Sequence, residues 1–239
     1  MAEDLDYIAY FARTKKFNVK PRTIFVEGPT DVRLFEYAAK LEKEKTGFDL
    51  LGDRLAIIAA GEGDEGGARG VCRELVSFKN MAKGLLLPSG RPKYRFVGLF
   101  DNDRAGRQAI NDIRKTDTSI LEFKDVFRLW PVIPISPNLD VDAVRKAFES
   151  ENEIYKNLDW ELEDILPASF SDTIIKENPN AVYRSCPMHD KVHREWSPDG
   201  KAKLNRLTIQ YAIHKDLETV INILHAFWHY LNIKPLEIK

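Results

Sequence analysis

The chain has 239 residues, a length that allows one large domain or a compact domain with a smaller lobe, and we expect the second arrangement. Its 36 Lys and Arg residues are balanced by 37 Asp and Glu residues, which excludes a strongly basic nucleic-acid coat and an acidic tail and confines any nucleic-acid surface to a local patch. The two cysteines lie far apart, the chain starts with acidic residues and no long apolar run follows. We therefore expect a soluble cytoplasmic protein without a disulfide framework, a signal peptide or membrane contact.

Apolar runs that alternate between strand and helix spacing occupy the first 135 residues. Runs of β-forming residues predict strands at 23–26, 55–60, 94–100 and 126–130. Helical spacing predicts helices at 4–17, from Thr30 past Leu41, at 71–78 and at 105–115, with Thr30 as the N-cap of the second. The glycine-rich stretch 61–70 is expected to be a loop. Strands that alternate with helices in this way indicate a mostly parallel sheet covered on both faces.

The pattern changes after Pro131. Two further prolines interrupt it, short helical segments follow, and residues 177–200 form a polar stretch. The clearest helix of the chain then spans residues 217–231, where apolar side chains recur at i, i+3, i+4 and i+7. We therefore expect an α/β protein whose core, with the N-terminal helix, covers residues 1–135, and whose smaller, mainly helical C-terminal lobe covers residues 136–239.

Acidic residues follow two of the predicted strands, at the point where each strand ends. Glu27 and Asp31 follow the first strand, and Asp101 and Asp103 follow the strand at 94–100. Because the carboxyl ends of parallel strands meet at one crevice, these four side chains can converge. Clustered carboxylates are costly without a cation, and Mg²⁺ prefers oxygen ligands, so the pattern predicts a metal site. Each acid taken singly is also consistent with a helix cap or a turn, and Asp31 with the helix dipole.

Two segments resemble a known family. Val26–Asp31 (VEGPTD) and Gly98–Gly106 (GLFDNDRAG) are similar to the TOPRIM domain, which topoisomerases, bacterial primases, recombination mediators, ribosomal-RNA maturases and OLD-family nucleases share. The likeness covers residues 20–135. It implies a Rossmann-like sheet that binds Mg²⁺ or Mn²⁺, with two ions at the site and with the core metal ligands Glu27, Asp101 and Asp103.

Within this family, the chain looks like the OLD nucleases and their stand-alone relatives. The form Glu-Gly-x-Thr-Asp implies that Asp31 is an additional metal ligand. The acidic segment Trp160–Leu166 (WELEDIL) implies the same for Glu163. Glu163 is equally consistent with a solvated helix face beside two buried apolar residues.

The OLD enzymes also use a lysine from the C-terminal part of the domain to steady charge on the phosphate. Lys201 and Lys203 both occupy a matching position, and the choice between them stays open, as does an ordinary surface role for both. Together with Glu163, such a lysine implies that the lobe over residues 136–239 contributes to the active site.

The sequence departs from full-length OLD proteins because it has no Gly-x-x-x-x-Gly-Lys-Ser/Thr motif. The resemblance therefore points to the stand-alone TOPRIM effectors of antiphage systems, such as the nuclease component of PARIS, which are held by a separate ABC-type ATPase. The expected function is a Mg²⁺-dependent endonuclease that hydrolyses DNA or RNA, tRNA included, by a two-metal mechanism. The alternative is a non-catalytic module that docks to an ATPase or a recombination or repair partner, with the apolar face of the C-terminal helix pairing with another chain. A homodimer stays open.

Basic residues at two places could contact the nucleic-acid backbone. Arg104 and Arg107 follow Asp103 at the start of a helix. A second stretch mixes basic and aromatic side chains and is as consistent with a polar loop around a small core; its basic candidates are Arg184, Lys191 and Arg194.

Two further motifs suggest other sites. Residues 61–66 (GEGDEG) fit the dinucleotide pattern Gly-x-Gly-x-x-Gly, but three of the intervening residues are acidic, so a flexible loop beside the crevice is favoured. One cysteine and several histidines, namely Cys186, His189, His193, His225 and His229, have spacings that suggest part of a zinc site. No second cysteine lies near them, and surface or capping histidines are favoured.

Overall fold

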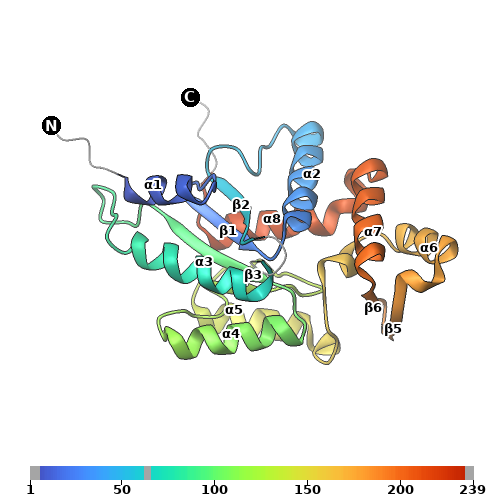
Figure 1. Ribbon diagram of the computed structural model, residues 1–239. Helices are drawn as coiled ribbons and strands as arrows, with labels where there is room; N and C mark the ends of the chain where they lie inside the picture. The colour runs from blue at the N-terminus through green and yellow to red at the C-terminus, as the bar shows by residue number, and fades with distance from the viewer. Residues whose placement is uncertain (1–5, 62–65, 235–239) are drawn as a thin grey trace.

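The computed structural model describes residues 6–61 and 66–234 (Figure 1). Its strands are β1 (Arg22–Val26), β2 (Leu55–Ala59), β3 (Arg95–Phe100), β4 (Val126–Arg128), β5 (Val182–Met188) and β6 (Lys191–Trp196). Its α-helices are α1 (Tyr7–Thr14), α2 (Pro29–Thr46), α3 (Gly67–Ala82), α4 (Arg104–Thr116), α5 (Val141–Glu151), α6 (Ala168–Glu177), α7 (Pro198–Tyr211) and α8 (Glu218–Tyr230). Short 3₁₀ turns lie between several of them and include η3 (Leu162–Ile165) and η5 (His214–Leu217).

Four strands form a parallel sheet in the order β2-β1-β3-β4. Ile24 of β1 pairs with Ile57 of β2 on one side and with Val97 of β3 on the other. A helix connects each of these strands to the next one along the chain, as a parallel sheet requires. The predicted α/β architecture with a central parallel sheet flanked by helices is confirmed.

Both faces of this sheet are covered by helices. Successive side chains of a strand point to opposite faces, so β1 contributes to two cores. Ile24 and Val26 lie in a core with α2, α8 and segments after β4. Phe25 lies in a second core with α1, α3 and α4. Figure 1 shows α3 and α4 on one side of the sheet and α2 on the other.

The start of α2 differs from the prediction at its cap. Pro29 is the first helical residue, where its fixed φ and missing N–H suit the helix, so Gly28 is the N-cap and Thr30 lies inside the first turn. Gly28 N donates a hydrogen bond to Asp31 Oδ2 at 3.0 Å. The prediction of Thr30 as N-cap is therefore wrong, and the carboxylate of Asp31 satisfies the free backbone N–H instead.

Helices α1 and α3 differ from their predicted lengths. α3 begins at Gly67, inside the stretch predicted as a loop, because Gly67 takes a positive φ of 64° that redirects the chain into the helix. α1 begins at Tyr7 with Asp6 as its N-cap. The first residues of the predicted helix at 4–17 and the loop acids Glu62, Asp64 and Glu65 lie outside the described residues.

The predicted polar stretch at 177–200 contains a β-hairpin. Strands β5 and β6 pair antiparallel, with Val182 opposite Trp196, and the chain turns at His189, where φ is 54°. A two-stranded sheet consists only of edge strands, which tolerate Pro187. The C-terminal part expected to be mainly helical therefore contains a small sheet beside α5, α6, α7 and α8.

Helix α8 belongs to the core of the protein. Its apolar residues Val220, Leu224 and Phe227 are at most 2% exposed and share one core with Ile24 of β1. The expectation that this apolar face pairs with another chain is therefore wrong, because the parallel sheet and α2 already cover it. A domain boundary near residue 135 stays a prediction, although one core joins the residues on both sides of it.

Two arginines at the starts of strands hold the end of α8. Arg22 Nε donates to the carbonyl oxygen of Leu231 at 3.2 Å, and Arg95 donates to that of Tyr230 at 2.8 Å. These carbonyls end the helix and lack intrahelical partners, so cationic donors suit them. Among the residues that the structure describes, no helix combines the length and the apolar character needed to cross a membrane.

Candidate metal centre

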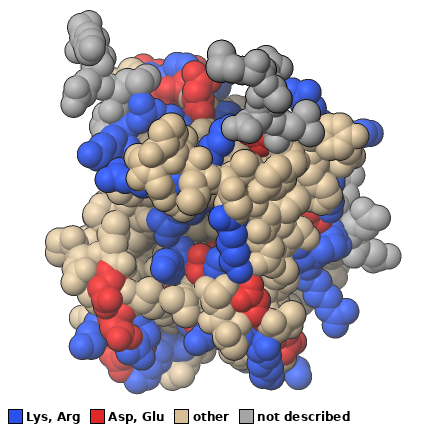
Figure 2. Space-filling view, turned by 90° about the vertical axis from the view of Figure 1, so that its left-hand side faces the viewer, with Lys and Arg blue, Asp and Glu red and all other residues tan. Residues whose placement is uncertain are grey.

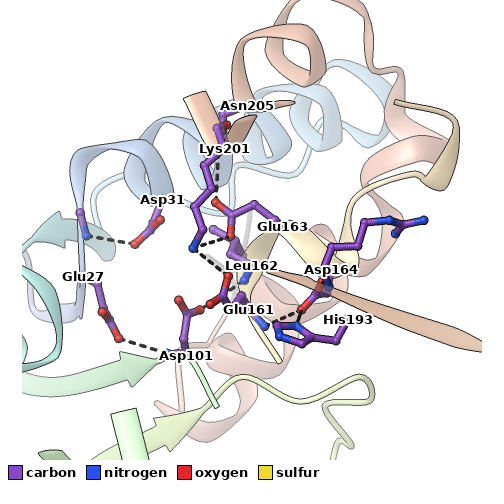
Figure 3. Close-up of polar contacts among 12 residues, drawn as sticks. Glu27, Asp31, Asp101, Glu161, Leu162, Glu163, Asp164, His193, Lys201 and Asn205 are labelled. Carbon is purple, nitrogen blue, oxygen red and sulfur yellow. Dashed lines mark hydrogen bonds and ion pairs between the residues drawn. The ribbon is translucent and has the colours of Figure 1, made fainter. Parts of the chain in front are cut away.

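A cleft of about 360 Å³ opens at the carboxyl ends of β1 and β3, between the turn after β1 and the segments η3 and α7. Its ionisable lining comprises Glu27, Asp31, Asp101, Glu163 and Lys201. Figure 3 shows these side chains directed toward one another from separate elements. Because β1 and β3 are adjacent and parallel, their ends bring together Glu27 and Asp101, which are 74 residues apart in the sequence.

Glu27 and Asp101 face each other across the ends of the two strands. Asp101 N donates to Glu27 Oε1 at 3.3 Å, and Leu162 N donates to Asp101 Oδ1 at 3.2 Å. Burial raises the pKa of Glu27 to about 7, and the charges of Asp31 and Asp103 add to this effect. Burial and the charge of Glu27 also raise the pKa of Asp101 well above its usual range. Both carboxylates are therefore short of compensating positive charge.

Asp31 caps α2 and also faces the cleft. Burial raises the pKa of its carboxyl to about 6, the charge of Glu163 adds to this, and the hydrogen bond from Gly28 opposes it. A residue that served only the helix dipole would have its charged form favoured. The raised pKa indicates that burial, together with the charge of Glu163, outweighs the helix start at Asp31.

Segment η3 carries further acids to the same cleft. Asn102 and Trp160 form two backbone hydrogen bonds of 2.8 and 3.3 Å, which fix this segment to the end of β3. Trp160 is 1% exposed and Glu163 is 7% exposed. The interpretation of Glu163 as part of a solvated helix face is therefore wrong, because η3 is docked against the strand ends.

Glu161 is an acidic residue beside the cleft that the sequence analysis did not select. Its Oε2 atom lies 2.7 Å from Lys201 Nζ, and burial raises the pKa of its carboxyl while Lys201 opposes the increase. Glu161 has extended backbone angles and precedes the short η3 turn, so it lies on the same side as Glu163. The spacing i, i+2 in a non-helical segment was the available signal.

Lys201 is the lysine that the structure places in the cleft. Its Nζ atom lies 2.7 Å from Glu161 and 3.6 Å from Glu163. Burial alone would lower the pKa of Lys201, but the charges of Glu163 and Glu161 raise it, so the ammonium group stays charged. Asn205, one turn later in α7, donates to Glu163 Oε1 at 3.4 Å. Lys203 is exposed and does not line the cleft.

Asp103 lies at the edge of the site, where it caps α4. Gly106 N donates to Asp103 Oδ1 at 2.7 Å. A Cβ atom at Gly106 would approach the carbonyl oxygen of Asp101 to 2.1 Å, so only glycine allows α4 to start this close to the end of β3. Asp103 does not line the cleft, but its charge contributes to the raised pKa of Glu27.

The arginines at the start of α4 that were predicted to bind nucleic acid differ in how free their side chains are to contact phosphate. Arg104 is exposed at the start of α4, whereas Arg107 donates to the carbonyl oxygen of Asn102 and to Asp159, both at 2.7 Å. Arg107 therefore helps to hold the turn after β3. The side of the molecule drawn in Figure 2 mixes basic, acidic and uncharged side chains, and its described residues form no continuous basic stripe.

The three basic candidates of the hairpin each lie near an acid. Arg184 is 3.9 Å from Glu195 and Lys191 is 3.5 Å from Asp190, both in exposed or partly exposed pairs. Arg194 lies 3.6 Å from an acidic residue of α6, and its side chain is only 14% exposed. Such surface pairs are weak, so Arg184 and Lys191 can still exchange their partners for phosphate.

The histidines considered as zinc ligands have separate partners. His193 Nδ1 lies 2.8 Å from Asp164 Oδ2, and this hydrogen bond raises the pKa of the imidazole. His225 lies 3.1 Å from Glu42, and His229 lies 2.5 Å from the carbonyl oxygen of Ser136. These contacts divide the histidines among different elements.

The donor set of the cleft fits a hard cation. Of the residues that the structure describes, four carboxylates line it against one ammonium group, and the pKa is raised above its ordinary value for three of them, Glu27, Asp31 and Asp101. Among residues 6–61 and 66–234, no three His, Cys, Asp or Glu side chains are already arranged as a metal-binding group. Lys201 lies among the carboxylates of η3 in this arrangement, so a metal ion there would require Lys201 or the carboxylates to move.

No model of a known protein family, no curated protein and no solved structure matches the chain.

Proposed function

We propose that the protein is a Mg²⁺- or Mn²⁺-dependent TOPRIM nuclease of the OLD type. The observation that carries this proposal is a group of buried carboxylates at the ends of two adjacent parallel strands. These carboxylates have too little compensating positive charge around them. Glu27, Asp31, Asp101 and Glu163 would hold the metal, with two ions expected and with Asp103 as a further candidate at the edge of the cleft. When bound, Mg²⁺ would activate a water and stabilise the negative charge of a phosphodiester under attack.

The residues of the chain have distinct tasks in this proposal. Lys201 stays protonated beside Glu161 and Glu163, so it acts as a fixed positive charge next to a phosphate oxygen and not as a base. The hydrogen bond from Leu162 N holds one oxygen of Asp101, whose side chain lines the cleft. Arg104, exposed at the edge of the site, can meet the phosphate backbone of the substrate.

Cleavage assays test this function. Purified protein is incubated with plasmid DNA, single-stranded DNA or tRNA in the presence of Mg²⁺ or Mn²⁺, and Glu27→Ala is compared with Glu44→Ala, an exposed glutamate of α2. We expect Glu44→Ala to cleave like the wild type and Glu27→Ala to lose all activity above background. Equal cleavage by the wild type and Glu27→Ala would overturn the proposal.

A second assay separates the two lysines. Removing a positive group that stabilises transition-state charge typically lowers the rate by about 100-fold or more, so Lys201→Met should show such a loss. Lys203→Met, which changes an exposed lysine of the same helix, should retain wild-type cleavage. The reverse ranking would assign the phosphate contact to Lys203.

In the setting that we propose, the enzyme is a toxic antiphage effector that a separate ABC-type ATPase restrains. The 239 residues contain no P-loop motif, so P-loop ATP hydrolysis that controls the cleft would come from outside them. A non-catalytic TOPRIM module remains the second candidate. The ion pair between Lys201 and Glu161 favours it, because it already neutralises part of the cleft. Inert isolated protein that co-purifies with an ATPase would support the module.

A further inference from the structure

A groove beside the parallel sheet follows the free edge of β2. It has a volume of about 640 Å³ and lies between the segment after α1 and the first turns of α2. All five residues of β2, from Leu55 to Ala59, line it. Successive side chains of a strand point to opposite faces, so a groove that touches all five must run along the backbone edge. The cleft with the carboxylates lies elsewhere, at the carboxyl ends of the strands.

The pairing of β2 with β1 identifies the backbone groups that face this groove. Ala60 N donates to Val26 O at 2.9 Å, and Arg22 N donates to Arg54 O at 3.0 Å. In a parallel pair, alternate residues turn their N–H and C=O groups toward the same neighbour. The even-numbered residues therefore face β1, and the groups that face outward belong to Leu55, Ile57 and Ala59. No described strand pairs with this edge.

The groove combines apolar side chains with a basic rim. Phe17 and Val32 present apolar surface on its two sides. Its charged lining residues are the bases Lys15, Lys16, Lys20 and Arg33 and the single acid Glu36. Lys20 is bonded to the carbonyl oxygens of Leu51 and Gly52, and Lys15 to Glu74, whereas Lys16 and Arg33 are exposed. Glu36 is exposed as well, so the open part of the rim has two bases against one acid and a net positive charge.

We propose that an extended acidic segment of a partner protein binds here by adding a strand to β2. An edge of alternating N–H and C=O groups matches a peptide backbone, and the rim attracts acidic side chains. A nucleic-acid strand fits less well, because its phosphates can pair with the N–H groups but not with the outward carbonyls. A second copy of this chain would bring two basic rims together, which like charges oppose.

Peptide binding and NMR test this proposal without reference to cleavage. The probe is a short labelled peptide in which glutamate alternates with valine, and a lysine–valine peptide is its control. We expect the acidic peptide to bind, and hydrogen exchange to slow at the amides of Leu55, Ile57 and Ala59. Ala59→Pro removes an outward N–H and leaves the hydrogen bonds to β1, so binding should weaken about tenfold or more.

Charge variants provide a second test of the proposal if the proline variant does not fold. Arg33→Glu reverses an exposed charge of the rim and should weaken binding about tenfold. Lys40→Glu, an exposed lysine of the same helix outside the groove, should change it less than about twofold. No binding by the wild type, equal binding by Arg33→Glu, an oligonucleotide that competes for the groove, or a dimer closed by β2 would each overturn the proposal.

Discussion

Two groups of buried acids in this protein have opposite electrostatic surroundings. In the cleft, burial raises the pKa of Glu27 to about 7 and that of Asp31 to about 6. Glu42 of α2 is also buried, with a side chain only 8% exposed, but hydrogen bonds from His214 and His225 at 2.6 and 3.1 Å outweigh the effect of burial and lower its pKa. The shifts are opposite because Glu42 has hydrogen-bonding partners of its own, whereas the cleft carboxylates share one lysine.

The contrast separates acids that hold the fold together from acids that are available to a ligand. Glu42 joins α2 to η5 and α8, and its partners satisfy both of its oxygens. The carboxylates of the cleft repel one another and keep oxygens directed into an open cavity. This repulsion lowers the stability of the folded state, and a bound cation would relieve it.

The largest effect should come from removing the single cation of the cleft. Lys201→Met leaves Glu161 and Glu163 without their partner, and we expect a loss of about 3 kcal/mol in the free energy of unfolding near pH 8. The value lies at the low end for a buried pair because the Lys201 side chain is 35% exposed. Urea unfolding measures it. Lys203→Met should change stability by less than about 0.5 kcal/mol, and a loss of similar size in both variants would contradict the distinction.

Removing the acid of the satisfied cluster should come next. Glu42→Leu deletes the two hydrogen bonds to His214 and His225 and should cost about 2 kcal/mol of unfolding free energy in chemical denaturation. Glu44→Leu, in an exposed pair of the same helix, is the control and should be close to neutral. A stabilised Glu42→Leu variant would show that this cluster is as strained as the cleft.

Neutralising an acid of the cleft should have the opposite sign. Asp101→Asn relieves the repulsion with Glu27 and keeps the size of the side chain, so we expect about 1 kcal/mol of added stability in EDTA. Mg²⁺ should raise the melting temperature of the wild type and leave that of the variant unchanged. Destabilisation by this substitution in EDTA would contradict the view that the carboxylates are short of positive charge.

The smallest effects are the pH dependences, which should slope in opposite directions. The pKa of Glu27 rises from 4.5 to about 7 on folding, so the protonated folded state is favoured and stability should fall as the pH increases across this range. The pKa of Glu42 lies below 4.5, so its contribution is present above that pH and is lost as the pH falls further. In EDTA each slope should stay below about 1.4 kcal/mol per pH unit, the limit for a single proton. Thermal melts of Glu27→Gln and Glu42→Gln should flatten the high-pH and low-pH sides respectively.

The parallel sheet and the meeting of its strand ends could be predicted from the sequence. The hydrophobic periodicity identifies each strand and helix locally, and their alternation along the chain predicts the parallel topology. The alternation of strands and helices predicts that the ends of β1 and β3 share a crevice, and Glu27 and Asp101 lie there. The hairpin of β5 and β6 could not be predicted in the same way. Its exposed, mixed composition lacks a strong period, and Trp196 becomes buried only through tertiary contacts.

Helix phase and backbone geometry explain why the site residues in the structure differ from those predicted from the sequence. Lys201 shares a helical face with the buried Leu204 and Asn205, three and four residues later, whereas Lys203 points to solvent. That phase was present in the sequence and would have separated the two lysines. Glu161 was missed because a helical interpretation of its segment would have turned it away from Glu163, whereas the extended residue before η3 brings both to Lys201.

The contacts of Arg22 and Arg95 with the end of α8 have a consequence for folding during synthesis on the ribosome. Arg22 precedes Leu231 by 209 residues, and α8 completes the apolar face of the sheet that starts near Arg22. Helix α2 covers part of this face, but the part that α8 covers stays exposed on a nascent chain until α8 has left the exit tunnel. We therefore expect the growing polypeptide to be prone to aggregation until the C-terminal segment has been made.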